Sequence, residues 1–345
     1  MTNIPIGQKR IDSFSPIRLS NMIHGMFYTQ LIFVAAKLNL ADLLKDGGKP
    51  IKELALATGT LELRLYRMMR ALASVGIFTE SKPKYFELTP LAELLQSGSP
   101  GSQKNLAIKM GSKWYLHAWA NILHSVQQEK SAFDDNADLF EYLQNHPADA
   151  AVFNHAMTFT SQMQAAAICH AYDFSGVKTI VDIAGGYGFL LSVILKAHPT
   201  LKGMIFDKPY VIKTVRARFK ADGLDQRCRI IEGDFFDSIP EGSDVYILKH
   251  VIHNWDDAHA VTILKNCRKA MKANSRILVI DAIIPVKNPS FKEIWSDIEM
   301  MVMLSNGRER TKSEFKNLFD QAGFKLNKII PTSSELSIIE GIRLK

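Results

Sequence analysis

The chain has 345 residues, 47% of them hydrophobic, so it can bury a full core and suits two globular domains or one large one. Its formal net charge of +7 is spread along the sequence without a polybasic run, which argues against a nucleic-acid partner. Three scattered cysteines, Cys169, Cys228 and Cys267, lack C-x-x-C spacing and predict neither a disulfide framework nor a zinc site.

The beginning of the chain does not look like a targeting segment. Residues 1–16 are polar, and the most apolar stretch, residues 22–44, is interrupted by polar and charged side chains. We therefore expect no signal peptide, no membrane span and a cytoplasmic protein.

Residues 17–44 carry apolar side chains at helical spacing on more than one side of the predicted helices. Such helices need a partner surface, so we predict a homodimer. The segments that follow have the order of a winged helix: helices at 51–59 and 61–76, a strand at 77–81, a turn around Pro83, and a strand and helix within 84–96.

The second half of the chain has a different pattern. Residues 114–170 are predicted to be helical, and after Asp173 short β-rich runs alternate with helices. The runs expected to be strands are 178–186, 203–207, 229–234, 244–253, 275–284 and 336–344. This alternation predicts a parallel, doubly wound α/β sheet with helices on both faces. We place the main boundary near residues 165–178 and divide the chain into residues 1–110, 111–172 and 173–345.

A glycine-rich turn follows the first of these strands. In VDIAGGYG, Gly185, Gly186 and Gly188 permit a tight turn and the close approach of the backbone to a ligand. Ligands of open α/β sheets bind at this edge. The turn alone fits a nucleotide site, an S-adenosylmethionine site or a structural role about equally well.

Acidic residues end the next two strands. Asp207 lies about 20 residues beyond the glycines, where a carboxylate can accept hydrogen bonds from both ribose hydroxyls, although a helix N-cap is the alternative. Asp234 is followed by Phe235, whose ring could flank an adenine. Because the turn has the order GG-x-G and no phosphate-binding G-x-x-x-x-G-K-[ST] occurs, the pattern favours an adenosine cofactor without phosphates.

The fourth strand ends in ILKHVIHNWDD, which brings Lys249, His250, His253, Asn254 and Trp255 to the same edge. The unperturbed pKa of histidine is near neutrality, so His253 is a candidate general base for a hydroxyl group. An isolated histidine more often has a structural role, and this alternative stays open at this point.

Two acids downstream favour the catalytic interpretation. Asp281 ends the strand ILVIDAIIP and Glu309 lies in GRERTKSEF, and either carboxylate can orient an imidazole and stabilise its cation. For Glu309 the alternative is a cap or a salt bridge with Arg308 or Arg310.

The glycine turn, FDKP, GDFF, LKHVIHNWDDAHAVTILKNCRKAM and GRERTKSEFKNLFDQAGF together resemble the small-molecule O-methyltransferases. These include caffeic acid and acetylserotonin O-methyltransferases and bacterial polyketide and phenazine enzymes. The resemblance covers nearly the whole chain, and residues 30–97 resemble the N-terminal dimerisation domain of that family. It implies a Rossmann-like class I methyltransferase domain behind a winged-helix-like dimerisation domain.

The resemblance also implies roles for individual residues. S-adenosyl-L-methionine would be bound by Ser161, Asp182, Gly185, Gly186, Asp207, Gly233, Asp234, Phe235 and Lys249, and S-adenosyl-L-homocysteine would be the product. His253 would be the base, flanked by Asp281 and Glu309, with no metal. The acceptor pocket would be lined by Phe153, Met157, Asn254, Met300 and Leu304, although ordinary core packing is the alternative for its apolar members.

The sequence departs from the family pattern at three positions. Ala184 replaces the first glycine of D-x-G-G-G, Asn254 replaces the aspartate of His-Asp-Trp, and Asp281 is one carbon shorter than the glutamate often found there. Alanine adds only a methyl group, so we expect cofactor binding to survive. We also expect His253 to rely more on Glu309 than on Asp281.

We expect an O-methyltransferase of secondary metabolism that acts on a small hydroxylated aromatic or heteroaromatic molecule. Three rival functions fit the sequence less well. A winged-helix DNA-binding regulator would use Arg64, Arg67 and Arg70, but the surrounding leucines and methionines leave that helix little polar face. A family member that binds the cofactor without transferring its methyl group is disfavoured by His253 and Glu309. A nucleic-acid methyltransferase is disfavoured by the apolar pocket candidates. The identity of the acceptor stays open.

Overall fold

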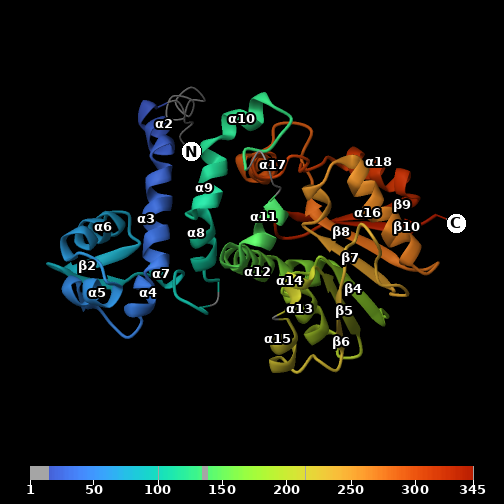
Figure 1. Cartoon of the computed structure of the whole chain (residues 1–345), viewed down its shortest axis with the longest axis horizontal. Coiled ribbons are helices and arrows are strands. Elements are labelled where there is room, and N and C mark those ends of the chain that lie inside the picture. Colours follow the sequence, from blue (N-terminus) through green and yellow to red (C-terminus); the bar gives the residue numbers. More distant parts are fainter. Residues whose placement is uncertain (1–14, 100, 134–138, 214, 345) are drawn as a thin grey trace, which may run out of the picture. The chain divides into compact units, whose positions relative to one another are not determined.

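The computed structural model describes residues 15–99, 101–133, 139–213 and 215–344. The chain divides into two compact units, Met1–Lys113 and Trp114–Lys345 (Figure 1). Among the described residues, no helix is long and apolar enough to cross a membrane.

The first unit contains helices and a small antiparallel sheet with the strand order β1-β3-β2. Its elements are α2 (Pro16–Ile23), α3 (Gly25–Lys37), α4 (Leu40–Leu43), β1 (Lys49–Pro50), α5 (Ile51–Thr58), α6 (Glu62–Ser74), β2 (Phe78–Lys82), β3 (Tyr85–Leu88), α7 (Pro90–Glu93) and α8 (Lys104–Met110). From α5 to α7 this order agrees with the expected winged-helix layout. The two-residue strand β1, which pairs with β3, was not expected.

Helix α6 buries one narrow stripe and exposes the rest of its surface. Leu65, Met69 and Leu72 are buried, because residues four and three apart lie on the same helix face. The three arginines at positions 64, 67 and 70 are exposed. The expectation that this helix has little polar face was therefore wrong, because the leucines and methionines around the arginines do not all share one side.

Helices α2 and α3 expose a continuous series of large apolar side chains, although no residue of α2 is buried. We call the exposed members the helical patch: Ile17, Leu19, Met22, Ile23, Met26, Phe27 and Tyr28, each at least 43% exposed. Clustered exposed apolar surface of this kind is typical of a protein–protein interface.

We expect the double substitution Met26→Glu and Phe27→Glu to weaken self-association by at least about tenfold, because burying two unpaired carboxylates in an apolar interface is costly. Light scattering over a range of protein concentrations measures the effect. The matched control is Leu56→Glu on α5, which changes an apolar side chain that is 85% exposed and lies outside the patch. A wild-type protein that stays monomeric at micromolar concentration would contradict this prediction.

The second unit is a seven-stranded sheet with helices on both faces. Its helices are α9 (Lys113–Ala120), α10 (Ile122–Gln127), α11 (Leu139–Asn145), α12 (Pro147–Ala171), α13 (Phe189–Ala197), α14 (Pro209–Ile212), α15 (Val215–Ala221), the 3-10 turn η2 (Ile252–Asn254), α16 (Asp257–Ala270), α17 (Phe291–Met303) and α18 (Lys312–Ala322). Its strands are β4 (Thr179–Ile183), β5 (Lys202–Asp207), β6 (Cys228–Glu232), β7 (Val245–Lys249), β8 (Arg276–Ala282), β9 (Phe324–Pro331) and β10 (Leu336–Arg343).

The strand order is β6-β5-β4-β7-β8-β10-β9, and β10 runs antiparallel to both of its neighbours. The expectation of a wholly parallel sheet is corrected at this end, because a short turn joins β9 to β10 and only antiparallel strands can be connected so closely. The edge strand β9 was not predicted. Its Lys325, Asn327 and Lys328 are exposed, and these polar residues obscure the apolar alternation.

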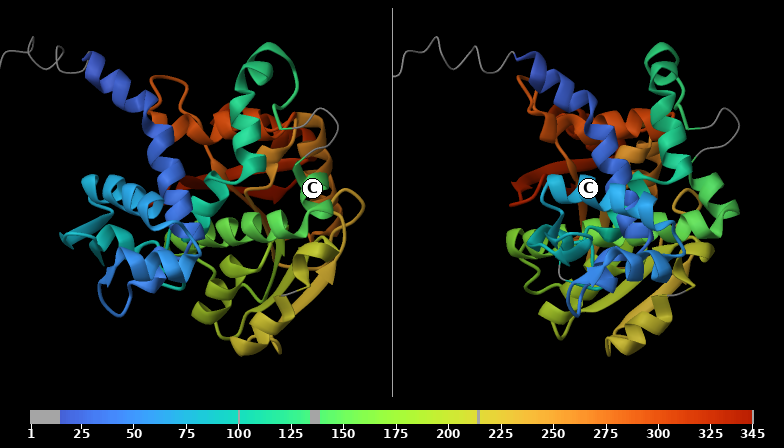
Figure 2. Two further views of the ribbon diagram at one scale, coloured as in Figure 1. Left: turned by 60° about the vertical axis from the view of Figure 1, so that its left-hand side comes forward. Right: turned by 90° about the vertical axis from the view of Figure 1, so that its left-hand side faces the viewer.

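Helices cover both faces of this sheet (Figures 1 and 2), and the buried side chains form two hydrophobic clusters. Along β7, Val245 and Ile247 belong to one cluster, while Tyr246 and Leu248 belong to the other. This alternation follows from the two-residue period of a strand. Since side chains on both faces are buried, polar groups that act on a ligand are confined to the strand ends.

Candidate active site

The glycine-rich turn joins β4 to α13 and is held against the end of β5. The Gly186 N–H donates to Asp207 Oδ2 over 2.8 Å, and the Lys208 N–H donates to Asp207 Oδ1 over 2.7 Å. A Cβ at Gly185 would lie 2.9 Å from Cγ of Asp182, so that position needs a glycine. Asp207 therefore fixes the turn and keeps its carboxylate at the edge of the sheet, where burial raises its pKa to about 6.

Buried charges lie beside this turn. Burial raises the pKa of Asp182 to about 7, although the nearby Lys249 ammonium opposes the change. Burial also lowers the pKa of Lys249 to about 8, against the attraction of Asp182 and Asp281. Both groups therefore titrate near neutral pH.

The buried amide of Gln164 connects three segments and was missed by the sequence analysis. Its oxygen accepts a hydrogen bond from Lys249 Nζ over 3.3 Å and lies 3.1 Å from His250 Nε2. Its amide nitrogen donates to Glu335 Oε1 over 2.5 Å. The only available sequence signal was a polar residue within the apolar run of α12.

Asp234 and Phe235 follow the end of β6 and lie at the same edge of the sheet. Asp234 accepts hydrogen bonds from Lys208 Nζ (2.5 Å) and from the Phe236 N–H (2.9 Å). The Phe235 ring packs edge-on against Trp255, with 6.0 Å between ring centroids. A Cβ at Gly233 would lie 2.4 Å from the Phe206 ring, which explains the glycine there.

His253 lies in η2, just beyond β7, and its imidazole Nδ1 is 2.8 Å from Glu309 Oε1. The two side chains are almost completely buried. Glu309 is positioned in turn, because its N–H donates to Asp297 Oδ1 over 2.8 Å. The arrangement leaves Nε2 of His253 as the nitrogen available for proton transfer.

Arg308 and Arg310 tie the loop of Glu309 to the loop of His253. The Arg308 N–H donates to the His253 carbonyl over 2.8 Å. The fully buried Arg310 guanidinium donates to the carbonyls of Ile252 (3.0 Å) and Trp255 (2.7 Å). Sequence analysis had treated these arginines only as possible salt-bridge partners of Glu309, whereas they hold the backbone around His253.

Asp281, at the end of β8, is fully buried, and neither of its carboxylate oxygens has a hydrogen-bond partner in the described protein. Three side chains come close enough to share a metal ion: the metal-ligating atoms of His250, His253 and Asp281 lie within 4.8 Å of one another. Within the described ranges this is the one such group. Burial raises the pKa of Asp281 to about 7. Burial lowers the pKa of His253, but Glu309 and Asp281 outweigh that effect and raise it to about 9.

The residues expected to contact the acceptor lie on two helices and at η2. Phe153, Met157 and Ser161 are half-buried and share one face of α12, because they are four residues apart. Met300 is half-buried on α17, and Leu304 is the buried residue that ends that helix. The Asn254 amide donates to the His250 carbonyl over 3.0 Å, so it braces the backbone beside His253.

A buried pair on the same side was missed by sequence analysis. The Tyr115 hydroxyl on α9 donates to Glu299 Oε1 on α17 over 3.0 Å. Burial and the Glu299 carboxylate raise the pKa of Tyr115 well above its usual value, so the phenol keeps its proton. The negative charge of Glu299 also raises the pKa of His253.

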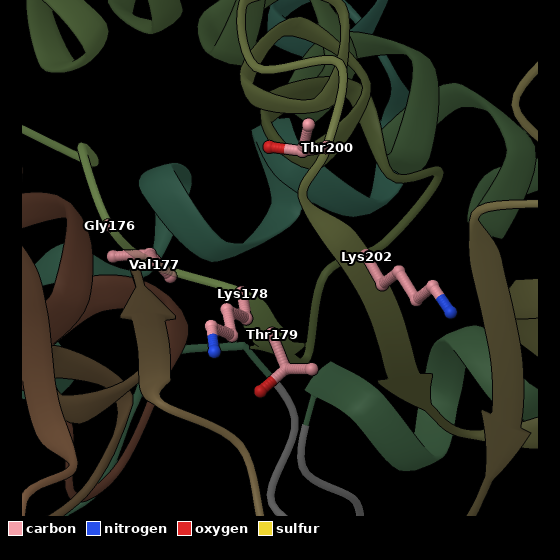
Figure 3. Close-up of a pocket in the computed structure, with 6 residues that line it drawn as sticks. All are labelled: Gly176, Val177, Lys178, Thr179, Thr200 and Lys202. Atoms are coloured by element: carbon pink, nitrogen blue, oxygen red, sulfur yellow. The ribbon is translucent and has the colours of Figure 1, made fainter.

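A separate hollow lies at the opposite, amino-terminal edge of the sheet (Figure 3). It is lined by Gly176, Val177, Lys178, Thr179, Thr200 and Lys202. Thr179 and Lys202 begin β4 and β5, whereas Asp207 and the glycine turn follow the ends of these strands. Figure 3 shows the two lysine ammonium groups pointing away from each other, so they do not converge on one ligand.

Comparison with known proteins defines the class. Residues 116–325 match the O-methyltransferase domain and residues 20–98 match the O-methyltransferase dimerisation domain. The fold and these matches are those of an S-adenosylmethionine-dependent O-methyltransferase with an N-terminal dimerisation domain. The chain belongs to this O-methyltransferase family, which confirms the resemblance seen in the sequence.

Three relatives illustrate the similarity. The chain is 44% identical to the phenazine O-methyltransferase PhzM of Lysobacter antibioticus over 93% of this chain and 94% of that protein. The crystal structure of LaPhzM superposes with a TM-score of 0.92 at 43% identity, covering 96% of this chain and all of that one. NcsB1 from neocarzinostatin biosynthesis, solved with S-adenosylmethionine and 2-hydroxy-5-methyl naphthoic acid, has a TM-score of 0.79 at 30% identity, covering 92% and 96%.

Ala184 adopts a left-handed backbone conformation, with φ of +53°, in the position where the family pattern has a glycine. The left-handed conformation destabilises the folded protein by about 1–2 kcal/mol when the residue is alanine. A glycine avoids this strain, but it makes the unfolded chain more flexible and so lowers the free energy of unfolding by about 0.4–1 kcal/mol. We expect Ala184→Gly to raise the free energy of unfolding by up to about 1 kcal/mol, which is about 2–4 °C in Tm. Thermal unfolding followed by circular dichroism measures this change.

The matched control is Ala166→Gly, at an exposed position inside α12. A glycine there should lower the free energy of unfolding by about 1 kcal/mol, so the two substitutions should have opposite signs. Equal destabilisation by both would show that Ala184 is not strained.

Proposed function

We propose that the protein methylates a hydroxyl group of a small aromatic or heteroaromatic metabolite, with S-adenosyl-L-methionine as the donor and His253 as the general base. The observation that carries the proposal is the buried 2.8 Å contact between His253 Nδ1 and Glu309 Oε1 at the carboxyl edge of the sheet. This contact fixes a tautomer in which Nε2 accepts a proton.

The cofactor assignment rests on the residues around the glycine turn. Asp207 has a carboxylate at the end of the second parallel strand, the position suited to ribose hydroxyls, and Gly185 and Gly186 let the backbone come close to a ligand. Bound there, the cofactor would supply a methyl group activated by a positively charged sulfur. We propose that the other cofactor contacts are Ser161, Asp182, Gly233, Asp234, Phe235 and Lys249.

The protein's task is to make the hydroxyl oxygen nucleophilic. Nε2 of His253 takes the hydroxyl proton as the oxygen attacks the methyl group, and the imidazolium that forms is stabilised by Glu309 and Asp281. Glu309 makes the direct hydrogen bond, whereas Asp281 acts through its buried charge. No metal is needed, because the base removes the proton that a Lewis acid would otherwise loosen.

The acceptor would bind between helices of the middle segment and the base. We propose that residues 111–172 join a dimerisation domain, residues 1–110, to a catalytic domain, residues 173–345. Phe153 and Met157 on α12 and Met300 and Leu304 on α17 offer apolar surface for an aromatic ring, and Asn254 braces the base. The relatives named for phenazine and neocarzinostatin biosynthesis support a role in secondary metabolism and a homodimer.

We expect the wild-type protein to bind S-adenosylhomocysteine with micromolar affinity and Asp207→Ala to bind it at least about tenfold more weakly, because two charge-assisted hydrogen bonds are lost. Isothermal titration calorimetry measures both constants. Asp225→Ala, at an exposed position in the turn before β6, is the control and should bind normally. If Asp207→Ala binds as tightly as the wild type, the ribose assignment is wrong.

We expect His253→Ala to lower kcat by at least about 100-fold and to change cofactor affinity by no more than a few fold, because the substitution removes the proton acceptor. The assay uses labelled S-adenosylmethionine with a panel of hydroxylated aromatics and mass analysis of the products. The acceptor hydroxyl should have a pKa well above the assay pH, since a more acidic phenol ionises unaided.

His259→Ala is the matched control for this assay. His259 also pairs with a carboxylate, Asp256, over 2.8 Å, but it is exposed on α16. It should keep full activity, and EDTA should have little effect on the wild type. Full activity of His253→Ala, or inhibition by EDTA that magnesium reverses, would overturn the proposed mechanism.

A further inference from the structure

Three buried carboxylates from separate elements act on the single imidazole of His253. Glu309 precedes α18, Asp281 ends β8, and Glu299 lies on α17, and all three raise the pKa of His253. Each is at most 6% exposed. We call Glu299, Asp281 and Glu309 the carboxylate cage.

The two cations near the cage both attract Asp281, but the hydrogen bonds of their side chains go to groups outside the cage. The Arg310 guanidinium donates to Asp257 and to two backbone carbonyls. Lys249 hydrogen-bonds to Gln164 and is attracted to Asp182 and Glu335 as well as to Asp281. The remaining titratable neighbours are Tyr115, which donates to Glu299 Oε1, His250, which is next to Lys249, and the half-buried Asp297, which accepts the Glu309 N–H.

The cage has unsatisfied oxygens. Both oxygens of Asp281 and Oε2 of Glu309 are buried without a hydrogen-bond partner in the described protein. Buried carboxylates without partners are costly unless a positive charge lies nearby. Above about pH 7, where Asp281 is ionised, a proton on His253 supplies that charge in the protein without ligands, in agreement with the 2.8 Å contact to Glu309 and the His253 pKa of about 9.

This protonated state conflicts with the work of a base, which must begin the reaction neutral. The proposed reaction removes this conflict, because the methyl donor is a cation whose positive charge can replace that of the proton on His253. As the carbon–sulfur bond breaks and the carbon–oxygen bond forms, the hydroxyl O–H bond breaks and an N–H bond forms on His253. One positive charge is present before and after, first on sulfur and then on the imidazole.

We propose that the carboxylate cage holds one positive charge at a time, so that binding of the cationic cofactor expels the proton from His253, whereas binding of the neutral product S-adenosylhomocysteine does not. The inference rests on the proposed function, because a hydroxyl proton that passes to His253 requires the donor sulfur to lie near the cage. In this proposal Asp281 and Glu299 attract the positively charged sulfur of the cofactor, in addition to raising the pKa of His253.

The sign of the pH dependence follows from proton linkage. A ligand that expels a proton binds more tightly as pH rises, by about tenfold per pH unit below the pKa of the group that loses it. S-adenosylmethionine should show this dependence and S-adenosylhomocysteine should not. The two ligands share their adenosine and amino-acid ends, so the titrations of Asp182, Asp207 and Lys249 cancel in the ratio of their affinities. Asp281, whose pKa is about 7, belongs to the cage, so the contribution of His253 is measured above that pH.

The test is isothermal titration calorimetry of the full-length protein with each ligand, without acceptor, from about pH 6.5 to 8.5 in buffers of different ionisation enthalpy. We expect S-adenosylmethionine to release up to about one proton more than S-adenosylhomocysteine. A non-reactive cofactor analogue that carries an ammonium group in place of the sulfonium should behave like S-adenosylmethionine.

Two substitutions locate the effect. In His253→Gln the difference in proton release between the two ligands should disappear, and in the control His259→Gln it should remain. Asp281→Asn should weaken S-adenosylmethionine several-fold relative to S-adenosylhomocysteine, because the cage loses one negative charge. Circular dichroism and the S-adenosylhomocysteine affinity report whether each variant is folded.

Equal proton release for the two ligands, or a difference that persists in His253→Gln, would overturn the inference. The outcomes separate it from the proposed function. Methyl transfer that depends on His253 without ligand-specific proton release refutes only the charge coupling. Ligand-specific proton release in a protein that methylates no hydroxyl refutes only the proposed reaction, and failure to bind either ligand refutes both.

Discussion

The buried contact between His253 and Glu309 is the interaction on which the candidate active site depends. It joins the loop after β7 to the loop before α18, and the same two loops are fastened by Arg308 and Arg310 through backbone carbonyls. A carboxylate buried this deeply is stable only with a positive or hydrogen-bonding partner, so the imidazole and the acid require each other. This pair therefore fixes the orientation of the imidazole, with Nε2 as the nitrogen that the proposed reaction uses, and holds the two loops together.

The core of the catalytic unit explains why the polar residues gather where they do. Strands such as β7 bury side chains on both faces, which leaves the carboxyl ends as the place where Asp207, Lys249 and Asp281 can meet a ligand. Burial at that edge shifts several pKa values toward neutrality, and the neighbouring carboxylates raise the pKa of His253 despite its burial. The proposed coupling between the charge of the cofactor and the charge of His253 depends on this burial.

Two strained residues mark this edge. Ala184 after β4 and His250 after β7 both have positive φ values, which are unfavourable for side chains with a Cβ. Each is held by neighbours: the Ala184 N–H donates to the Phe206 carbonyl over 2.8 Å, and the His250 carbonyl accepts the Asn254 amide. Strain of this kind persists only where surrounding contacts outweigh it, and here it shapes the two turns that face the proposed ligands.

The sequence by itself determined the class of protein, the winged-helix order of the first unit, and the alternation of strands and helices. It also placed Asp207, Asp234, His253 and Asp281 at or just beyond the carboxyl ends of strands, although the strand predicted over residues 244–253 ends at Lys249 and His253 lies in η2. These features have local signatures, because turn glycines, apolar periodicity and residues at strand ends are read within a few positions. Only the tertiary structure decided that Glu309, 56 residues from His253, makes the hydrogen bond while Asp281 stays without one. It also decided the roles of Gln164, Arg310 and Glu299, the antiparallel strand β10 and the exposed arginines of α6. The physical reason is that contacts between distant segments, and the burial that shifts pKa values, arise from packing and leave no periodic pattern in the chain.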